Sequence, residues 1–133
     1  MSRMILRTLV LLSAVAAWHG AFAVGILAPQ ASRESAVTVK VTPKALTGPM
    51  WEFEVVFDTH TQPLNDDLMK NAVLILADGT QVTPASWQAD PPGGHHRKGI
   101  LRFNAPVRAQ SMVELRITRP GEARPRSFKW KRE

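Results

Sequence analysis

Cysteine and tyrosine are both absent from the 133 residues. Without cysteine the chain can form no disulfide and has no thiolate for catalysis or for binding a soft metal. The serine-hydrolase pattern G-x-S-x-G and the zinc-protease pattern H-E-x-x-H are missing too. The sequence therefore predicts a domain that is stabilised by packing alone and is not an enzyme.

The first 23 residues have the layout of a secretory signal peptide. Arg3 and Arg7 form a positive segment, residues 8–17 are almost wholly apolar, and Ala21-Phe22-Ala23 is a small-x-small cleavage site. The apolar run is short for a membrane span, which needs about 20 residues. We therefore expect cleavage after Ala23 and a periplasmic or secreted protein. A retained membrane anchor is the alternative.

Alternating apolar and polar residues predict short β-strands over most of the remaining chain. After a linker over residues 24–35, we expect strands over residues 37–41, 51–57, 72–77, 81–87, 99–104, 112–119 and 126–131, with one helical turn near residues 67–70. Pro84 interrupts the strand at residues 81–87. Seven short strands separated by turn signals favour a single antiparallel immunoglobulin-like β-sandwich over residues 36–133. A small open barrel is the alternative. Trp51 and Trp130 fall in the apolar phase of their strands, so we expect both in the core.

Three histidines follow the signal segment, and each lies in a predicted loop or at a strand end. Asp58 and His60 stand two residues apart at the end of the clearest strand, so they project from the same face. His95 and His96 follow two glycines, which free the backbone for unusual angles. Counting back along the strand from Phe103, we expect His95 to point inward and His96 outward.

Two interpretations of these residues remain open. Because neutral imidazole is the commonest protein ligand for zinc and copper, His60, His95 and His96 with Asp58 in support predict a site for one of these metals. The same residues could instead lock two loops of a structural or protein-interaction domain. Their spacing matches no compact metal motif, so the sequence does not decide between a metal site and a loop lock.

Two segments carry a resemblance to known domains. Residues 51–60, WEFEVVFDTH, and residues 93–103, GGHHRKGILRF, resemble a group of small prokaryotic domains that are exported or membrane-attached. Those domains have D-T-H after an alternating strand and G-H-H before another. The resemblance implies that Asp58, His60, His95 and His96 act as one unit, and it implies no established activity.

The C-terminal segment is basic. Between residues 116 and 133 there are seven basic side chains: Arg116, Arg119, Arg124, Arg126, Lys129, Lys131 and Arg132. One interpretation is an anionic surface or an acidic protein partner. The other is a solvated edge strand that its charges protect from aggregation. Nucleic acid is not expected as a partner of an exported chain, and a membrane is expected only if the N-terminal segment is retained.

Overall fold

The computed structural model of the protein describes residues 27–132, so the predicted signal peptide lies outside the described residues. The strands in this range are β1 (Gln30–Glu34), β2 (Val37–Ala45), β3 (Met50–Thr59), β4 (Ala72–Leu76), β5 (Gln81–Val82), β6 (Ser86–Ala89), β7 (His96–Asn104), β8 (Met112–Ile117) and β9 (Arg126–Lys131). One helical turn, α1 (Leu68–Asn71), lies close to where the sequence predicts it. Between residues 27 and 132, no helix has the length and apolar character needed to cross a bilayer.

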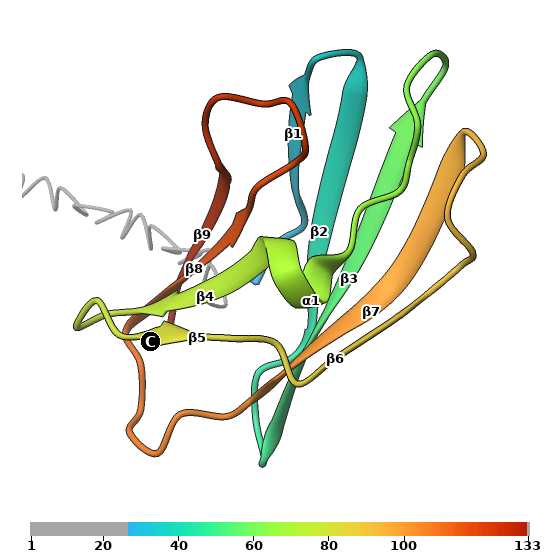
Figure 1. The fold of residues 1–133 in the computed structure, drawn as a ribbon. Coiled ribbons are helices and arrows are strands. Elements are labelled where there is room, and N and C mark those ends of the chain that lie inside the picture. Colours follow the sequence, from blue (N-terminus) through green and yellow to red (C-terminus); the bar gives the residue numbers. More distant parts are fainter. Residues whose placement is uncertain (1–26, 133) are drawn as a thin grey trace, which may run out of the picture.

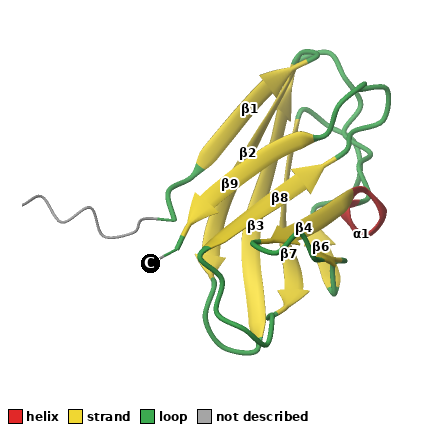
Figure 2. Cartoon of the chain, turned by 90° about the vertical axis from the view of Figure 1, so that its left-hand side faces the viewer, coloured by secondary structure: helices red, strands yellow, loops and turns green. Residues whose placement is uncertain are grey.

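The strands form two antiparallel sheets that face each other (Figures 1 and 2). The first sheet has the order β1-β2-β3-β7-β6 and the second the order β5-β4-β8-β9. Strands β2-β3-β7-β6 opposite β4-β8-β9 reproduce the ABED and CFG sheets of an immunoglobulin domain, with β1 and β5 as additions. The predicted immunoglobulin-like β-sandwich is therefore confirmed.

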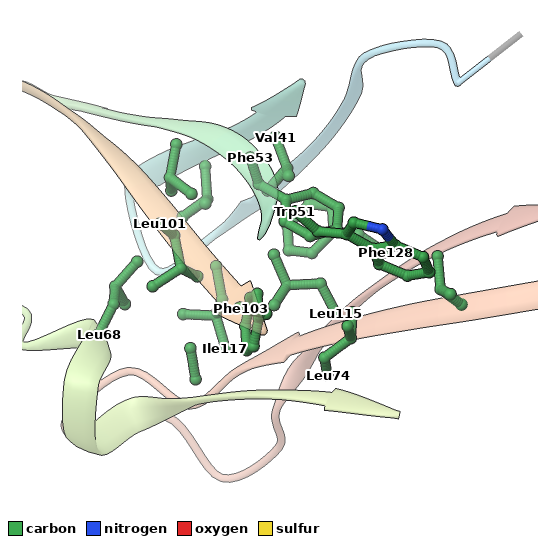
Figure 3. Close-up of a cluster of buried hydrophobic side chains, with 14 of the residues drawn as sticks. Val41, Trp51, Phe53, Leu68, Leu74, Leu101, Phe103, Leu115, Ile117 and Phe128 are labelled. Carbon is green, nitrogen blue, oxygen red and sulfur yellow. The ribbon is translucent and has the colours of Figure 1, made fainter. Parts of the chain in front are cut away.

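Strand alternation produces the core between the sheets. In β3, Trp51, Phe53, Val55 and Phe57 are buried, while the residues between them face outward. The Phe53 ring meets Phe103 of β7 edge-on, with ring centroids 5.8 Å apart (Figure 3). Full burial of such a side chain is worth about 1.5–3 kcal/mol, which is how a chain without disulfides remains folded. Trp51 and Trp130 are 4% and 3% exposed, as their phase predicts.

The linker predicted over residues 24–35 ends earlier than expected, because Gln30–Glu34 form β1. This strand has the sequence QASRE and buries no residue fully, so it carries no alternating apolar signal. It pairs with β2 instead through a two-residue turn, Ser35 and Ala36.

The strand predicted over residues 81–87 is also wrong in its extent. Proline has no N–H to donate to a sheet, and Pro84 divides the segment into β5 and β6. The two pieces belong to different sheets. The chain therefore crosses the sandwich near Pro84, where the sequence predicts an interruption within a single strand.

The outer edge of β9 is partly covered by Gln30 and the residues before it. The side chain of Gln30 in β1 donates to the carbonyl of Lys129 and accepts from the Lys129 N–H at 3.1 Å, as a paired backbone amide would. Nearby, the indole N–H of Trp130 donates to the carbonyl of Ala28 at 2.8 Å. Side chains thus join β1 to β9 across one side of the sandwich. Part of the β9 edge is therefore covered by β1 and the residues just before it.

Candidate functional site

Four connections meet at one end of the sandwich, which we call the loop end (upper part of Figure 1). They are the β1–β2 turn at residues 35–36, the connection from β3 to α1 at residues 60–67, the β6–β7 loop at residues 90–95 and the β8–β9 loop at residues 118–125. Loops fixed on a rigid sandwich are where immunoglobulin-like domains carry their binding residues.

The D-T-H and G-G-H-H segments lie next to each other at the loop end. Asp58 in β3 stands directly opposite His96 in β7, and its Oδ1 lies 2.6 Å from His96 Nδ1. One residue further, the Thr59 N–H donates to the carbonyl of His95 at 2.9 Å. His60 follows Thr59 and lines the same groove as Asp58 and His95. The fold therefore brings all four predicted site residues to one place.

Their geometry differs from the prediction in two ways. His95 is exposed, so the expectation that it points inward is wrong; the inward place is taken by Arg97, which is 5% exposed. Secondly, residues 27–132 contain no group of three or more His, Cys, Asp or Glu side chains arranged to hold a metal ion. Asp58 and His96 form a pair on the surface, with side chains 53% and 61% exposed.

An open groove of about 660 Å³ lies beside this pair, and we call it the Arg33 groove. It is lined by Arg33, Ala36, Thr38, Asp58, Thr59, His60, Thr61 and His95. Its wall is tied together by the Thr59 hydroxyl, which donates to the carbonyl of Ala36 at 2.9 Å and accepts from the N–H groups of Thr61 and Gln62. The β1–β2 turn and the end of β3 are therefore held in a fixed relation.

Three buried arginines hold the loops of this end, and the sequence does not predict any of them as a site residue. The first is Arg97 in β7. Its guanidinium donates to the carbonyls of Asp90 at 2.9 Å and Asp66 at 2.6 Å, and more weakly to that of Leu64 at 3.4 Å. The N–H of Gly93 also donates to the Leu64 carbonyl. Arg97 thus joins the β6–β7 loop to the connection from β3 to α1.

The second buried arginine is Arg119, at the start of the β8–β9 loop. It makes a two-pronged contact with Asp66, at 2.9 Å and 3.0 Å, and a longer contact with Glu122 at 3.3 Å. Arg119 and Asp66 are 6% and 2% exposed. Two-pronged arginine–carboxylate contacts are among the strongest ion pairs in geometry and energy, so this pair fixes the β8–β9 loop against the same connection.

The third is Arg126, which is 1% exposed. It makes a two-pronged contact with Glu122 at 2.8 Å and 2.7 Å, and its remaining N–H groups donate to the carbonyls of Ser32, Glu34 and Val37. All five of its donors therefore find an acceptor. The hydrogen bond from Arg126 lowers the pKa of Glu122, although burial of the carboxylate acts in the opposite direction. This cluster fixes the β8–β9 loop against the β1–β2 turn.

The strand phase contained a signal for these residues. Arg97 is in the inward phase of Leu101 and Phe103, and Arg126 is in the inward phase of Phe128 and Trp130. An arginine in the apolar phase of a strand must find buried partners. Two of the seven basic residues counted near the C-terminus, Arg119 and Arg126, are accordingly engaged inside the protein and do not face an external partner.

The β1–β2 turn is the strained part of the loop end. Ser35 and Ala36 both have positive φ angles, 49° and 60°, in a two-residue turn of a kind that normally contains Asn-Gly. Such conformations persist where neighbouring contacts impose them. Here the contacts are those of Arg126 with the strands on both sides and of Thr59 with Ala36.

Comparison with known proteins supports the fold. No protein-family model matches the chain, and no curated protein matches it significantly. The structure is similar to the crystal structure of a DUF4426 family protein from Pseudomonas aeruginosa PAO1, with a TM-score of 0.50 and 12% sequence identity. The match covers 77% of this chain and 94% of that one. At this identity the likeness concerns the fold alone.

Proposed function

We propose that this chain is an exported recognition domain that binds a partner protein at its loop end and has no catalytic activity. The observation that carries the proposal is the set of buried arginines that joins four connections around the Arg33 groove. Loops that are already ordered lose less conformational entropy when a partner binds, which is the main advantage of preorganisation. Export is proposed from the N-terminal pattern in residues 1–23.

Two other uses of the same residues have less support. A zinc or copper site needs several converging ligands, and residues 27–132 provide no such group of three. A catalytic Asp-His pair works best where water is excluded, whereas Asp58 and His96 are both more than half exposed. In the proposed function this pair helps to hold β3 to β7 and borders the binding surface. Its own contribution to stability is small because it is exposed to solvent.

Site-specific photo-crosslinking in the producing cell tests this function. A photoreactive amino acid replaces Thr61, an exposed residue of the Arg33 groove. The matched control is Val107, a fully exposed residue in the β7–β8 loop at the other end of the sandwich. We expect a discrete adduct at position 61 that is absent at position 107, and we expect the captured protein to bind the purified domain.

The adduct must also depend on the groove. Replacing Thr61 by Trp in the purified domain should reduce binding of the captured protein, because the large ring occupies the groove, whereas the same change at Val107 should not. Equal adducts at both positions, or no adduct at position 61 while the exported protein is present, would contradict a recognition surface at the loop end.

A further inference from the structure

We propose that the Arg33 groove binds a carboxylate side chain of an extended acidic segment in the partner, and that Arg33 is the residue that selects it. This inference rests on the proposed function and adds the chemistry of the ligand. It starts from a row of side chains across the first sheet. Arg33 in β1, Thr38 in β2, Asp58 in β3 and His96 in β7 are register partners in succession.

Register partners in neighbouring strands point to the same face of a sheet. The row therefore lies on the outward face, at the border of the groove, and two contacts fix it. The Arg33 Nε–H donates to the Thr38 hydroxyl at 3.1 Å, and Asp58 pairs with His96 at 2.6 Å. Each contact joins two strands, so the polar groups at this border have defined positions.

Arg33 is the one arginine or lysine side chain among the residues that line the groove. Asp58 is the one carboxylate among the lining residues, and its partner is His96. Arg33 is exposed and has no ion pair within residues 27–132. Its contact with Thr38 uses Nε, so both terminal nitrogens keep their donors.

The shape of these donors favours a carboxylate. A guanidinium presents two parallel N–H donors that match the two oxygens of a carboxylate. Phosphate sites usually gather several cations or a nest of backbone N–H groups, and this groove has one arginine. The rings of His60 and His95 add further donors, while Ala36 and the threonine methyl groups provide apolar walls for an extended chain.

The strained β1–β2 turn borders the Arg33 groove. Ala36 lines the Arg33 groove, and Ser35 lines a second hollow of about 290 Å³ between the β1–β2 turn and the β8–β9 loop. The turn thus forms the ridge between two hollows at the loop end. Its fixed backbone also sets the position of Arg33, which precedes it by two residues in β1.

Titration by NMR tests the ligand class. The protein purified from the exported fraction is titrated with acetyl-tetraglutamate amide, with the matched tetraglutamine peptide and with inorganic phosphate, at constant ionic strength. We expect saturable amide shifts at Thr38, Thr61 and His95 with tetraglutamate alone. Arg33→Gln should weaken this binding at least about tenfold, because charge-assisted hydrogen bonds are the strongest kind.

Arg108→Gln is the control, since it removes the same charge from the exposed β7–β8 loop. It should change the affinity less than about twofold, because a distant surface charge is screened by salt. Equal weakening by both variants, or equal binding of phosphate, would overturn the carboxylate assignment.

The spectrum of Arg33→Gln shows whether the variant is folded, and we expect it to be, because Arg33 is exposed. If tetraglutamate fails to saturate while the adduct at position 61 still forms, the ligand class is wrong and the recognition function stands. If both experiments fail, the recognition function falls as well.

Discussion

Ser35 and Ala36 hold the most strained backbone in the described chain. Both adopt the left-handed region, with φ angles of 49° and 60°, and neither is the asparagine or glycine that this region favours. Each such residue costs about 1–3 kcal/mol, and strain of this kind is concentrated at functional sites. The strain is tolerated because Arg126 and Thr59 hold the turn from both sides.

Relieving this strain should stabilise the protein. We expect the double variant Ser35→Asn/Ala36→Gly to raise the free energy of unfolding by about 1 kcal/mol, measured by urea denaturation. The control is Gly79→Ala in the β4–β5 turn, where φ is +87°. There the added Cβ creates strain, and the free energy should fall by about 1 kcal/mol. No gain in the double variant would show that the turn is not strained.

Position 99 requires a glycine because β6 packs closely against it. A Cβ added at this position would lie 2.6 Å from Ala89 Cβ and 2.6 Å from the Trp87 ring, both on the neighbouring strand β6. The guanidinium carbon of Arg97 also lies over the Trp87 ring, 5.8 Å from its centroid. The small residue in β7 therefore makes room for the large one in β6.

Gly99→Ala should lower the free energy of unfolding by about 2 kcal/mol, the usual cost of overpacking. The double variant Gly99→Ala/Trp87→Leu should lose less than the sum of its single changes, because leucine leaves space for the new methyl group. Thermal unfolding of the four proteins measures this coupling. Additive losses would contradict a direct clash between the alanine and the tryptophan ring.

At the scale of elements, the loop end is held by buried arginines, whose hydrogen bonds and ion pairs join segments far apart in the sequence. Arg126 in β9 reaches the carbonyl of Glu34 in β1, 92 residues away, and Arg97 in β7 reaches the carbonyl of Asp66, 31 residues away. Buried ion pairs of this kind add little net stability compared with apolar packing, but removing one partner is costly. Their role is to select one arrangement of the loops.

Removing Arg126 should therefore destabilise the protein strongly. Arg126→Met leaves Glu122 and three carbonyl groups without their donor, and we expect a loss of about 3–5 kcal/mol in the free energy of unfolding. Arg126→Met/Glu122→Leu should lose less, because no orphaned carboxylate remains. The exposed control Arg124→Met should change stability by no more than about 0.5 kcal/mol. A double variant as unstable as Arg126→Met would contradict the pairing.

The same pair gives stability a dependence on pH. Arg126 holds the pKa of Glu122 below its ordinary value of 4.5 in the folded state. The charged form of Glu122 therefore stabilises the fold above that ordinary value, and this contribution disappears as the pH falls through the lowered pKa. The stability difference between the wild type and Glu122→Gln, measured by denaturation across this range, should shrink towards acid pH. A difference independent of pH would contradict the pairing.

At the scale of the whole molecule, the question is whether the histidines and Asp58 bind a metal or only lock two loops. The fold brings Asp58, His60, His95 and His96 together at the loop end, yet it exposes all four and forms no cluster of three ligands within the described residues. We therefore expect calorimetric titration with Zn²⁺ and Cu²⁺ to show no submicromolar one-to-one binding. Such binding, if lost in both His60→Ala and His95→Ala/His96→Ala, would establish a metal site that spans the two segments.

The alternation of apolar and polar residues was enough to predict the architecture. Burial of one face of each strand imposes a period of two, so Trp51 to Phe57, Phe128 and Trp130 could be placed in the core from the sequence. The strand at residues 126–131 agrees with β9 at both ends. β1 escaped prediction because it buries no residue fully, and the segment at residues 81–87 was misread because Pro84 sends its halves to different sheets.

The adjacency of Asp58 and His96 and the partners of Arg97, Arg119 and Arg126 depend on the tertiary structure alone. These contacts join residues 3 to 94 positions apart in the chain. Most of them are made possible by loops that converge at one end of the sandwich. Local patterns determine which face of a strand is buried, because burial depends on the hydrophobicity of each side chain in that strand. The partners of a buried charge are determined only when distant segments meet.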